Sequence, residues 1–172
     1  MTDERLKAHN EAKLAELYPA FRAKVSRLLY AMWALGWRCR IQCAWRSPQK
    51  QLEAFKSGNS KLRFGLHCIT ASDGTKESLA ADIIKDDDDI DPNGEDDLYH
   101  APKSYYIALA HCAEKEGLTT GVRWGLEKPM REAVSRAVTA NDSKYAGKIG
   151  WDPGHAQENI DSSAAKKGWR PK

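Results

Sequence analysis

Apolar residues recur at helical spacing through the first part of the chain, within residues 3–35. Pro19 interrupts this pattern, because proline cannot donate the backbone hydrogen bond that a helix interior needs. The pattern therefore predicts two helices, the second of which ends at Gly36. The apolar positions that define them are Leu6, Leu14, Leu17, Phe21, Val25, Leu28, Leu29 and Met32.

A strand pattern follows these helices. Residues 37–45 alternate basic and apolar side chains, which is typical of a strand with one buried face. Ser47 then has the side chain of an N-cap residue and Pro48 suits the first helical position, so a helix is expected from Pro48 to about Gly58. Residues 59–78 show no regular pattern.

The second half of the chain mixes the two kinds of element. The short apolar run at residues 79–84 contains one acid, Asp82, and predicts a buried strand in which the charge needs a partner. Pro102 predicts the start of a helix that ends before Gly117. Further elements are expected as a strand near residues 122–124, one or two helices over 128–146, and a last strand at 149–156. This mixture predicts an α+β fold with a small antiparallel sheet flanked by helices.

Composition is that of an ordinary globular protein, with 172 residues, of which 41% are hydrophobic and 30% charged. This length favours one domain over residues 1–172, ending in a basic tail at 158–172. No apolar stretch approaches the roughly 20 residues that cross a bilayer, so membrane insertion is not expected. The 27 basic and 24 acidic residues give a net charge of +3, which lacks the concentrated basicity of nucleic-acid binders.

The first residues are polar and lead directly into the helical pattern, so no secretory signal is expected and synthesis should leave the protein in the cytoplasm. The four cysteines are therefore expected to be free thiols: Cys39, Cys43, Cys68 and Cys112. Cys39 and Cys43 should face the same side of a strand, as core thiols in preference to a second metal site. The aromatic residues expected in the core or in a groove wall are Trp33, Trp37, Tyr105 and Tyr106.

An acidic block occupies residues 85–97. Within it, Asp89, Asp91 and Asn93 have the spacing of the first half of a calcium-binding loop. His100 stands where the bidentate glutamate of such a loop belongs. A solvated turn is therefore the favoured interpretation, and a Ca²⁺ site at these three residues is the alternative.

The candidate catalytic chemistry lies near the end of the chain. Asp152 precedes His155 by three residues, in a segment bent by a Pro-Gly dipeptide. Such a pair could place one group on a metal ion and the other beside a water molecule. Asp97 and His100 form a second pair with this spacing, but they lack the tryptophan and Pro-Gly context, which favours a surface histidine.

Three segments, in order, resemble the D-alanyl-D-alanine carboxypeptidase family of zinc peptidases, which includes the VanX and VanY enzymes and the L-alanyl-D-glutamate endopeptidases of bacteriophage lysins. The run from Arg46 to Gln51, RSPQKQ, resembles the family's Arg-Ser segment with a glutamine a few residues on. His67 with residues 78–83, SLAADI, resembles its Ser-x-His-x-x-Gly-x-Ala-x-Asp element. Residues 151–157, WDPGHAQ, resemble its closing Trp-x-Asp-x-x-His segment.

This resemblance implies a fold like that of the hedgehog and D-Ala-D-Ala peptidase proteins, with a catalytic core at about 37–157. It implies a Zn²⁺ ion held by His67, Asp82 and His155. Asp152 would act as general base and Arg46 would face the developing oxyanion. Zinc lowers the pKa of a bound water, so each residue type matches its implied task.

Relative to the family's first metal element, this chain has an insertion, which predicts a surface loop at residues 68–76 with a turn at Asp73. Asp73 is a rival to Asp82 as the carboxylate ligand. Its turn sequence favours Asp82, which lies in the Ala-Ala-Asp-Ile setting of the family. Thiolate coordination by Cys68, next to His67, is a minor alternative.

The resemblance therefore predicts a zinc metallopeptidase that hydrolyses peptidoglycan peptides. The favoured form is a monomeric bacteriophage endolysin, made in the host cytoplasm and cutting stem or cross-link peptides after release. One alternative is a D,D-carboxypeptidase or dipeptidase acting on D-alanyl-D-alanine ends. The alternative of another class is a metal-binding or wall-binding module without catalysis, in which Asp152 would have no task as a base.

Overall fold

The computed structural model describes residues 1–86 and 101–160, which form five α-helices, a single-turn 3-10 helix and four strands. In chain order these elements are α1 (Asp3–Leu14), α2 (Pro19–Ala34), β1 (Cys39–Cys43), α3 (Pro48–Lys56), η1 (Leu66–Cys68), β2 (Ala80–Lys85), α4 (Lys103–Lys115), β3 (Leu118–Gly121), α5 (Lys128–Ala140) and β4 (Asp152–Glu158).

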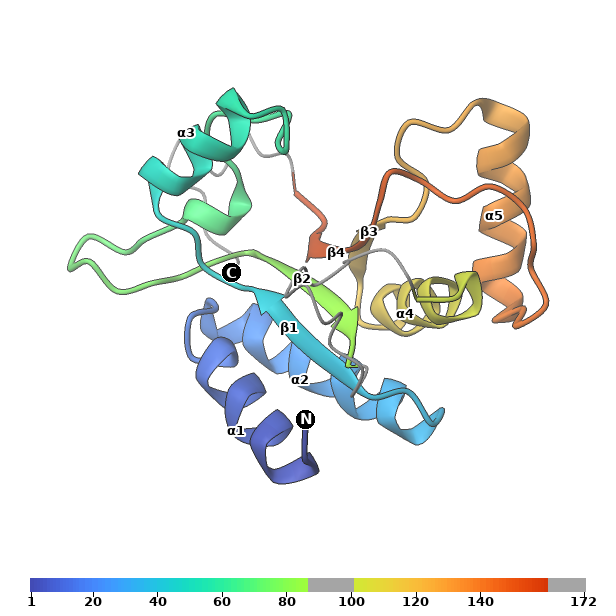
Figure 1. Ribbon diagram of the computed structural model, residues 1–172, viewed down its shortest axis with the longest axis horizontal. Coiled ribbons are helices and arrows are strands. Elements are labelled where there is room, and N and C mark those ends of the chain that lie inside the picture. The colour runs from blue at the N-terminus through green and yellow to red at the C-terminus, as the bar shows by residue number, and fades with distance from the viewer. Residues whose placement is uncertain (87–100, 161–172) are drawn as a thin grey trace.

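The four strands form one antiparallel sheet in the order β1-β2-β4-β3. The last strand of the described chain, β4, therefore lies between β2 and β3. In Figure 1, α1 and α2 lie below the sheet, α4 and α5 lie to its right and α3 lies above it. This arrangement confirms the expected α+β fold with a small antiparallel sheet and flanking helices.

Local sequence signals mark the start of α3 and the ends of α2 and α4. The Ser47 side chain caps α3 by accepting a hydrogen bond from the Lys50 amide at 3.2 Å, and Pro48 occupies the first turn. Gly36 and Gly117, with φ of 84° and 72°, follow α2 and α4 in a backbone conformation that favours glycine.

The core lies between the sheet and the helices α2 and α4. One stripe of α2 is fully buried at helical spacing, through Phe21, Val25, Leu28 and Met32. Each such side chain contributes about 1.5 to 3 kcal/mol through removal of its apolar surface from water. A second, smaller cluster joins α4 to α5. The core thus packs against one face of the sheet, and polar residues of the strands point to the opposite face.

The register of the strands places three polar residues in one row. Cys43 on β1 pairs with Asp82 on β2, and Asp82 pairs with His155 on β4. We call these three residues the polar row. Directly opposite residues of neighbouring strands place their side chains on one face of the sheet, close enough to interact. The polar row is therefore a product of strand register.

One predicted strand was displaced. A strand was expected near residues 122–124, but β3 ends at Gly121. The Trp124 amide donates to the Gly121 carbonyl at 3.0 Å, which turns the chain, and Gly125 follows with a φ of 70°. The expected strand at 149–156 likewise begins later, at Asp152, and over 128–146 there is one helix, α5.

The prediction for the aromatic residues was correct in part. Trp37 packs edge-on against the buried Tyr105 at 5.6 Å between ring centroids, and Tyr106 is also buried. Trp33 is 50% exposed, so its placement in the core was wrong. It follows the buried Met32 by one residue, which rotates it about 100° around α2 and away from the core.

Within the loop expected at residues 68–76, residues 72–76 are exposed and contain the expected turn, whereas Cys68 ends η1 and Ile69 is buried. The Asp73 carboxylate accepts a hydrogen bond from the Thr75 amide at 2.9 Å, and Gly74 has a φ of 89°. Asp73 is fully exposed and belongs to this turn. The carboxylate of Asp73, the rival metal ligand, therefore stabilises its own turn.

Several predictions fall on parts of the chain outside the described residues. These are the calcium ligands Asp89, Asp91 and Asn93, the surface His100, and the basic tail from residue 161 onward. Glu158, near the expected start of the tail, ends β4 and pairs with Lys24 at 2.7 Å. Among the described residues, no helix has the length and apolar character needed to cross a bilayer.

Candidate metal site and catalytic cleft

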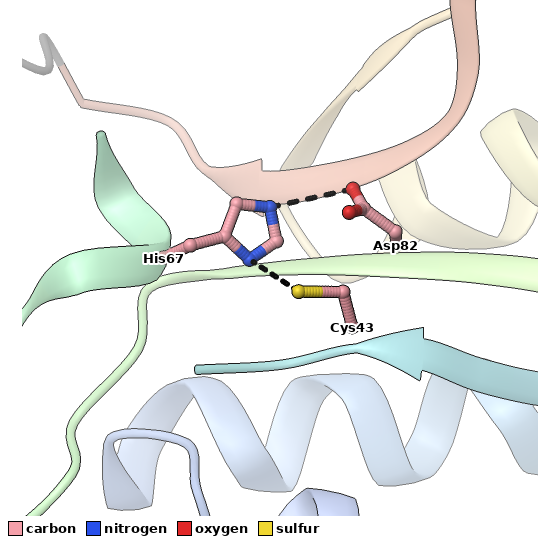
Figure 2. Close-up of side chains that lie close together, drawn as sticks. All are labelled: Cys43, His67 and Asp82. Atoms are coloured by element: carbon pink, nitrogen blue, oxygen red, sulfur yellow. Dashed lines mark hydrogen bonds and ion pairs between the residues drawn. The ribbon is translucent and has the colours of Figure 1, made fainter. Parts of the chain in front are cut away.

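His67 joins the polar row from outside the sheet. It lies in η1, which two backbone hydrogen bonds anchor: the Leu79 amide donates to the Leu66 carbonyl, and the Arg46 amide donates to the His67 carbonyl, both at 3.0 Å. These bonds connect η1 to the start of β2 and to the segment after β1. Figure 2 shows the His67 ring directed at Asp82 and Cys43.

Three potential metal ligands meet at one point. His67 Nε2 lies 3.3 Å from Asp82 Oδ1 and 3.4 Å from His155 Nδ1, and His155 Nδ1 lies 2.9 Å from Asp82 Oδ1. Nitrogen and oxygen ligands at about 2.0 to 2.1 Å from a tetrahedral zinc ion are about 3.3 to 3.4 Å apart. The spacing of the three atoms is therefore close to that of one face of a zinc coordination sphere.

The outer nitrogen of each ring has an acceptor. His67 Nδ1 donates to the Ala44 carbonyl at 2.6 Å, and His155 Nε2 donates to Gln157 Oε1 at 3.0 Å. These bonds leave His67 Nε2 and His155 Nδ1 as lone-pair nitrogens that face Asp82. These two nitrogens and the Asp82 oxygen all carry lone pairs, so their close contact requires a shared proton or a cation between them. The three ligand atoms thus fit a divalent metal ion, and the two rings have the outer hydrogen-bond partners that metal-binding histidines commonly have.

The pKa shifts of His67 and Asp82 also indicate that a positive charge is favoured at this point. Burial alone would lower the pKa of His67, but the Asp82 carboxylate and the Cys43 side chain raise it well above its usual value. Burial would raise the pKa of Asp82, yet His67 and His155 hold it well below its usual range. The cluster therefore favours a positive charge beside the Asp82 carboxylate.

Asp152 lies next to this point, at the first position of β4. Its Oδ2 is 4.0 Å from His155 Nδ1, and its side chain is 22% exposed. Asp82, Asp152 and His155 form a group whose potential ligand atoms all lie within 4.8 Å of one another. Burial raises the pKa of Asp152, and the nearby Asp82 carboxylate adds to this effect, while His155 opposes it. Asp152 is thus a carboxyl group with raised proton affinity beside the three ligands.

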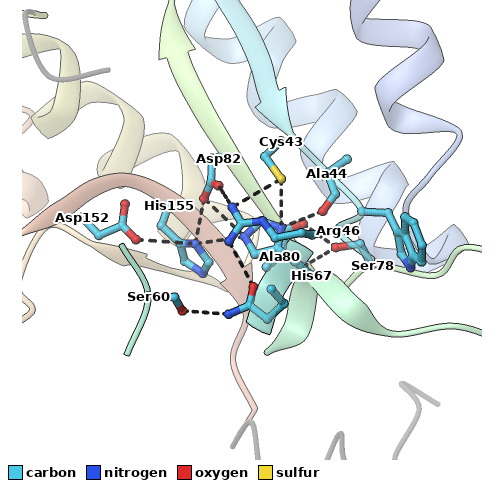
Figure 3. A network of polar contacts seen from close by, with 12 residues as sticks. Cys43, Ala44, Arg46, Ser60, His67, Ser78, Ala80, Asp82, Asp152 and His155 are labelled. Carbon is cyan, nitrogen blue, oxygen red and sulfur yellow. Dashed lines mark hydrogen bonds and ion pairs between the residues drawn. The ribbon is translucent and has the colours of Figure 1, made fainter. Parts of the chain in front are cut away.

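Arg46 also lies beside Asp82. Its guanidinium approaches Asp82 Oδ2 at 3.5 Å and Cys43 Sγ at 3.6 Å. Burial alone would lower its pKa, but Cys43 and Asp82 raise it, so the side chain carries its full charge. The sequence-predicted residues His67, Asp82, His155, Asp152 and Arg46 are therefore all brought together (Figure 3).

Gln51 holds Arg46 in this position. Its Oε1 accepts a hydrogen bond from Arg46 Nη1 at 3.0 Å. Its amide nitrogen donates to Ser60 Oγ at 2.7 Å and to the Leu62 carbonyl at 2.6 Å. Because Gln51 is only 3% exposed, these bonds fix its side chain. The glutamine of the Arg-Ser segment thus connects Arg46 to the loop after α3.

A cleft of about 1100 Å³ opens over these groups. The segment after α3 lines part of it with Ser60 and Lys61, and Trp124 and Trp151 line another part. The Trp124 ring lies 5.5 Å from that of Trp151 and 5.1 Å from the His155 imidazole, between centroids. The groove walls are therefore formed by Trp124 and Trp151 in place of the aromatic residues expected from the sequence.

Cys43 was misplaced by the sequence pattern. It was expected beside Cys39 as a core thiol, but a β-bulge between Ile41 and Cys43 shifts the register of β1. Its sulfur lies 3.9 Å from His67 Nδ1, and with His67 and Asp82 it forms a second group of potential metal ligands. Cys68, the other thiol considered, is buried beside His67 and belongs to neither group. Only the bulge, which the sequence does not reveal, separates Cys43 from a core position.

The bond from His155 to Gln157 leads to a testable prediction. Gln157→Leu removes the acceptor of His155 Nε2–H, so the ring can bind its proton at Nδ1 instead, and zinc affinity should fall about 10- to 100-fold. Gln157→Glu keeps an acceptor oxygen and should restore affinity. Zinc titration against a competing chelator measures both variants. Gln49→Leu, at an exposed position of α3, is the control; equal affinity of Gln157→Leu and wild type would contradict the assignment.

The two thiols of β1 should differ strongly in reactivity. Burial raises the pKa of Cys39 to about 12. Burial alone would also raise the thiol pKa of Cys43, but the contact with His67 and the charges of His67 and Arg46 together lower it. In the metal-free protein at pH 7.5, iodoacetamide should therefore alkylate Cys43 at least about 100 times faster than Cys39. Peptide mass spectrometry over time gives both rates, and similar rates for the two residues would refute this difference.

Comparisons with known proteins identify no family for this chain. No family model matches the sequence, and no curated protein matches it. Among solved structures, it is similar to the L-Ala D-Glu endopeptidase ChiX of Serratia marcescens, with 18% sequence identity over 88% of this chain and 87% of that chain, at a TM-score of 0.48. A likeness of this degree does not establish a shared activity.

Proposed function

We propose that this protein is a zinc-dependent peptidase that hydrolyses peptide bonds of bacterial peptidoglycan. The observation that carries the proposal is the meeting of His67 Nε2, Asp82 Oδ1 and His155 Nδ1 within 3.4 Å of one another at the base of an open cleft. Asp152 and Arg46 lie beside the same point. A structural histidine cluster would have no need of the open cleft or of a second carboxylate with raised pKa.

His67, Asp82 and His155 would hold the metal ion. When bound, zinc polarises the scissile carbonyl and makes water a stronger acid. The chain's own groups then divide the remaining tasks. The Ala44 carbonyl and Gln157 keep the two imidazole rings oriented through their outer nitrogens.

Asp152 is assigned the proton transfer. Its carboxylate accepts the proton of the attacking water and then delivers it to the leaving amine, so the proton begins on water and ends on the product. Burial raises the pKa of Asp152, which makes its carboxylate a stronger base toward the proton of the attacking water.

Arg46 is assigned to the carbonyl oxygen. Its charged guanidinium, fixed by Gln51, would stabilise the negative charge that develops when the amide is attacked. A preorganised donor of this kind lowers the barrier because it requires no reorganisation during the reaction.

The substrate class follows from the sequence segments and the cleft. The three ordered segments resemble a family that acts on wall peptides, and a cleft of about 1100 Å³ has room for several residues of an extended peptide. We further propose that the protein is a bacteriophage endolysin that acts on stem or cross-link peptides once it is released from the host cytoplasm.

The test is digestion of purified peptidoglycan by the full chain, with mass spectrometry of newly formed amino termini. New termini should appear with added zinc, disappear with a chelator and return when zinc is restored. New termini within stem or cross-link peptides would indicate an endopeptidase. Release of D-alanine or its dipeptide would indicate the carboxypeptidase or dipeptidase alternative. Zinc binding without any cleavage would refute the proposal in favour of a binding module.

A further inference from the structure

A second cavity adjoins the catalytic cleft. It has a volume of about 390 Å³ and lies where the end of α1, the end of β1 and the start of α3 meet. Its charged lining consists of Lys13, Arg46, Lys50, Lys76 and a single acid, Glu16. We call this cavity the basic pocket. Since the whole chain has nearly equal numbers of bases and acids, four bases around one acid are a local concentration of positive charge.

The one acid of the basic pocket is already neutralised. Glu16 contacts Lys76 at 2.7 Å and Lys13 at 3.6 Å, and accepts the Trp45 amide at 3.2 Å. Burial alone would raise the pKa of Glu16, but these contacts, led by Lys76, lower it. Glu16 therefore stays ionised and orders the two lysines. Of the other two bases, Arg46 pairs with Asp82 on the cleft side, and Lys50 is left for a ligand.

Lys50 lies in the first turn of α3. Within residues 1–86 and 101–160, no acidic side chain forms an ion pair with its ammonium group. The amino end of the helix adds to the positive potential there. Trp45 provides a flat wall, with the Lys76 ammonium 5.0 Å from its ring centre. The basic pocket thus has unneutralised charge and a rigid aromatic side.

The basic pocket and the catalytic cleft are connected. Gln42, Cys43 and Arg46 line both cavities. Arg46 contacts Asp82 at 3.5 Å on the cleft side, so a ligand in the basic pocket would lie within one side chain of the proposed metal site. A polymer whose peptide lies in the cleft can therefore place a neighbouring group in the basic pocket.

We propose that the basic pocket is an anion-binding subsite that takes an oxyanion group, carboxylate or phosphate, of the same polymer whose peptide occupies the cleft. The identity of the polymer rests on the proposed function, whereas the binding of an anion does not. Two sources offer the shared chemistry: carboxylates of the wall peptides, and phosphodiesters of an anionic polymer attached to the wall.

Anion binding is tested first, without any catalysis. Inorganic phosphate is titrated into the full-length protein at low ionic strength, and the Trp45 indole N–H signal is followed by NMR. Wild type should show a saturable shift. Lys13→Gln with Lys50→Gln should lose it, and Lys13→Arg with Lys50→Arg should keep it. Lys56→Gln, an exposed position of α3 outside the basic pocket, is the control. No saturable shift in wild type would overturn the proposal.

Substrate preference is tested second, through the KM for cleavage. For substrates that carry the relevant anion, the double glutamine variant should raise KM about 5- to 20-fold, as expected for one or two partly exposed ion pairs, and leave kcat unchanged. If the increase vanishes when peptide carboxylates are amidated, the peptide is the source. If it vanishes on walls stripped of phosphate polymers, that polymer is the source. An unchanged KM on every substrate would overturn the proposal.

The two proposals can fail separately. If wild type cleaves no wall peptide but shows the saturable, lysine-dependent phosphate shift, the proposed function fails and anion binding stands. If cleavage is zinc-dependent but phosphate causes no shift, the anion-binding subsite fails and the peptidase stands.

Discussion

Asp152→Asn should lower kcat for wall-peptide cleavage about 10²- to 10⁴-fold while zinc affinity stays within about threefold of wild type. The amide of asparagine keeps the size and shape of the carboxyl group but cannot accept the proton of an attacking water. Asp152 lies 4.0 Å from His155 Nδ1, outside the set of three atoms that meet at 2.9 to 3.4 Å. Release of new amino termini measures kcat, and a competing chelator measures affinity.

A binding module would behave differently under the same substitution. If Asp152 only lined the cleft of such a module, wild type would release no new amino termini, and Asp152→Asn would change only the binding of wall fragments. Cleavage by Asp152→Asn at the wild-type rate would therefore exclude Asp152 as the base. Loss of zinc together with activity would instead identify it as a ligand.

Asp82→Asn should lower zinc affinity by more than about 10²-fold, beyond the effect usual for residues that only orient a ligand. The substitution removes the negative charge that both imidazoles face, at 2.9 Å and 3.3 Å. Zinc should accordingly raise the Tm of wild type, because a ligand that binds the native state stabilises it, and should leave the Tm of Asp82→Asn almost unchanged. Calorimetry with and without zinc gives both shifts.

Asp73→Asn is the matched control for this prediction, because Asp73 is the aspartate that the sequence offered as a rival ligand to Asp82. Its side chain is exposed and bonds its own turn. Asp73→Asn should keep the full zinc-induced shift of Tm. The reverse result, with zinc stabilisation lost in Asp73→Asn and kept in Asp82→Asn, would mean that the carboxylate ligand was assigned to the wrong residue.

Much of the fold could be predicted because local signals carried it. Proline and glycine positions, the Ser47 cap and the apolar stripe of α2 are each short-range features with one physical meaning. The expected strand near residues 122–124 failed for the same reason. Its apolar and aromatic residues suit a strand, but the turn that replaces it is also held by a distant segment. The Gly150 amide donates to the Val122 carbonyl at 2.7 Å, which no local pattern indicates.

The candidate site could be predicted in its residues but not in its arrangement. Histidine, carboxylate and arginine in an ordered set of segments indicated His67, Asp82, His155, Asp152 and Arg46. No spacing along the chain indicates that Cys43 turns out of the core, because a β-bulge depends on how two strands pair. The roles of Trp124 and Trp151 depend likewise on tertiary packing.

Because of the polar row, the candidate site can form only when β2 and β4 pair in the correct register. Side chains alternate between the two faces of a strand, so a slip of β4 by one residue along β2 would bring Gly154 or Ala156 opposite Asp82 and turn His155 to the other face. Helix content would hardly change, and far-ultraviolet spectra would look native. A preparation that contains molecules with a shifted register would therefore bind less than one metal ion per chain, although spectroscopy of the backbone would not detect them.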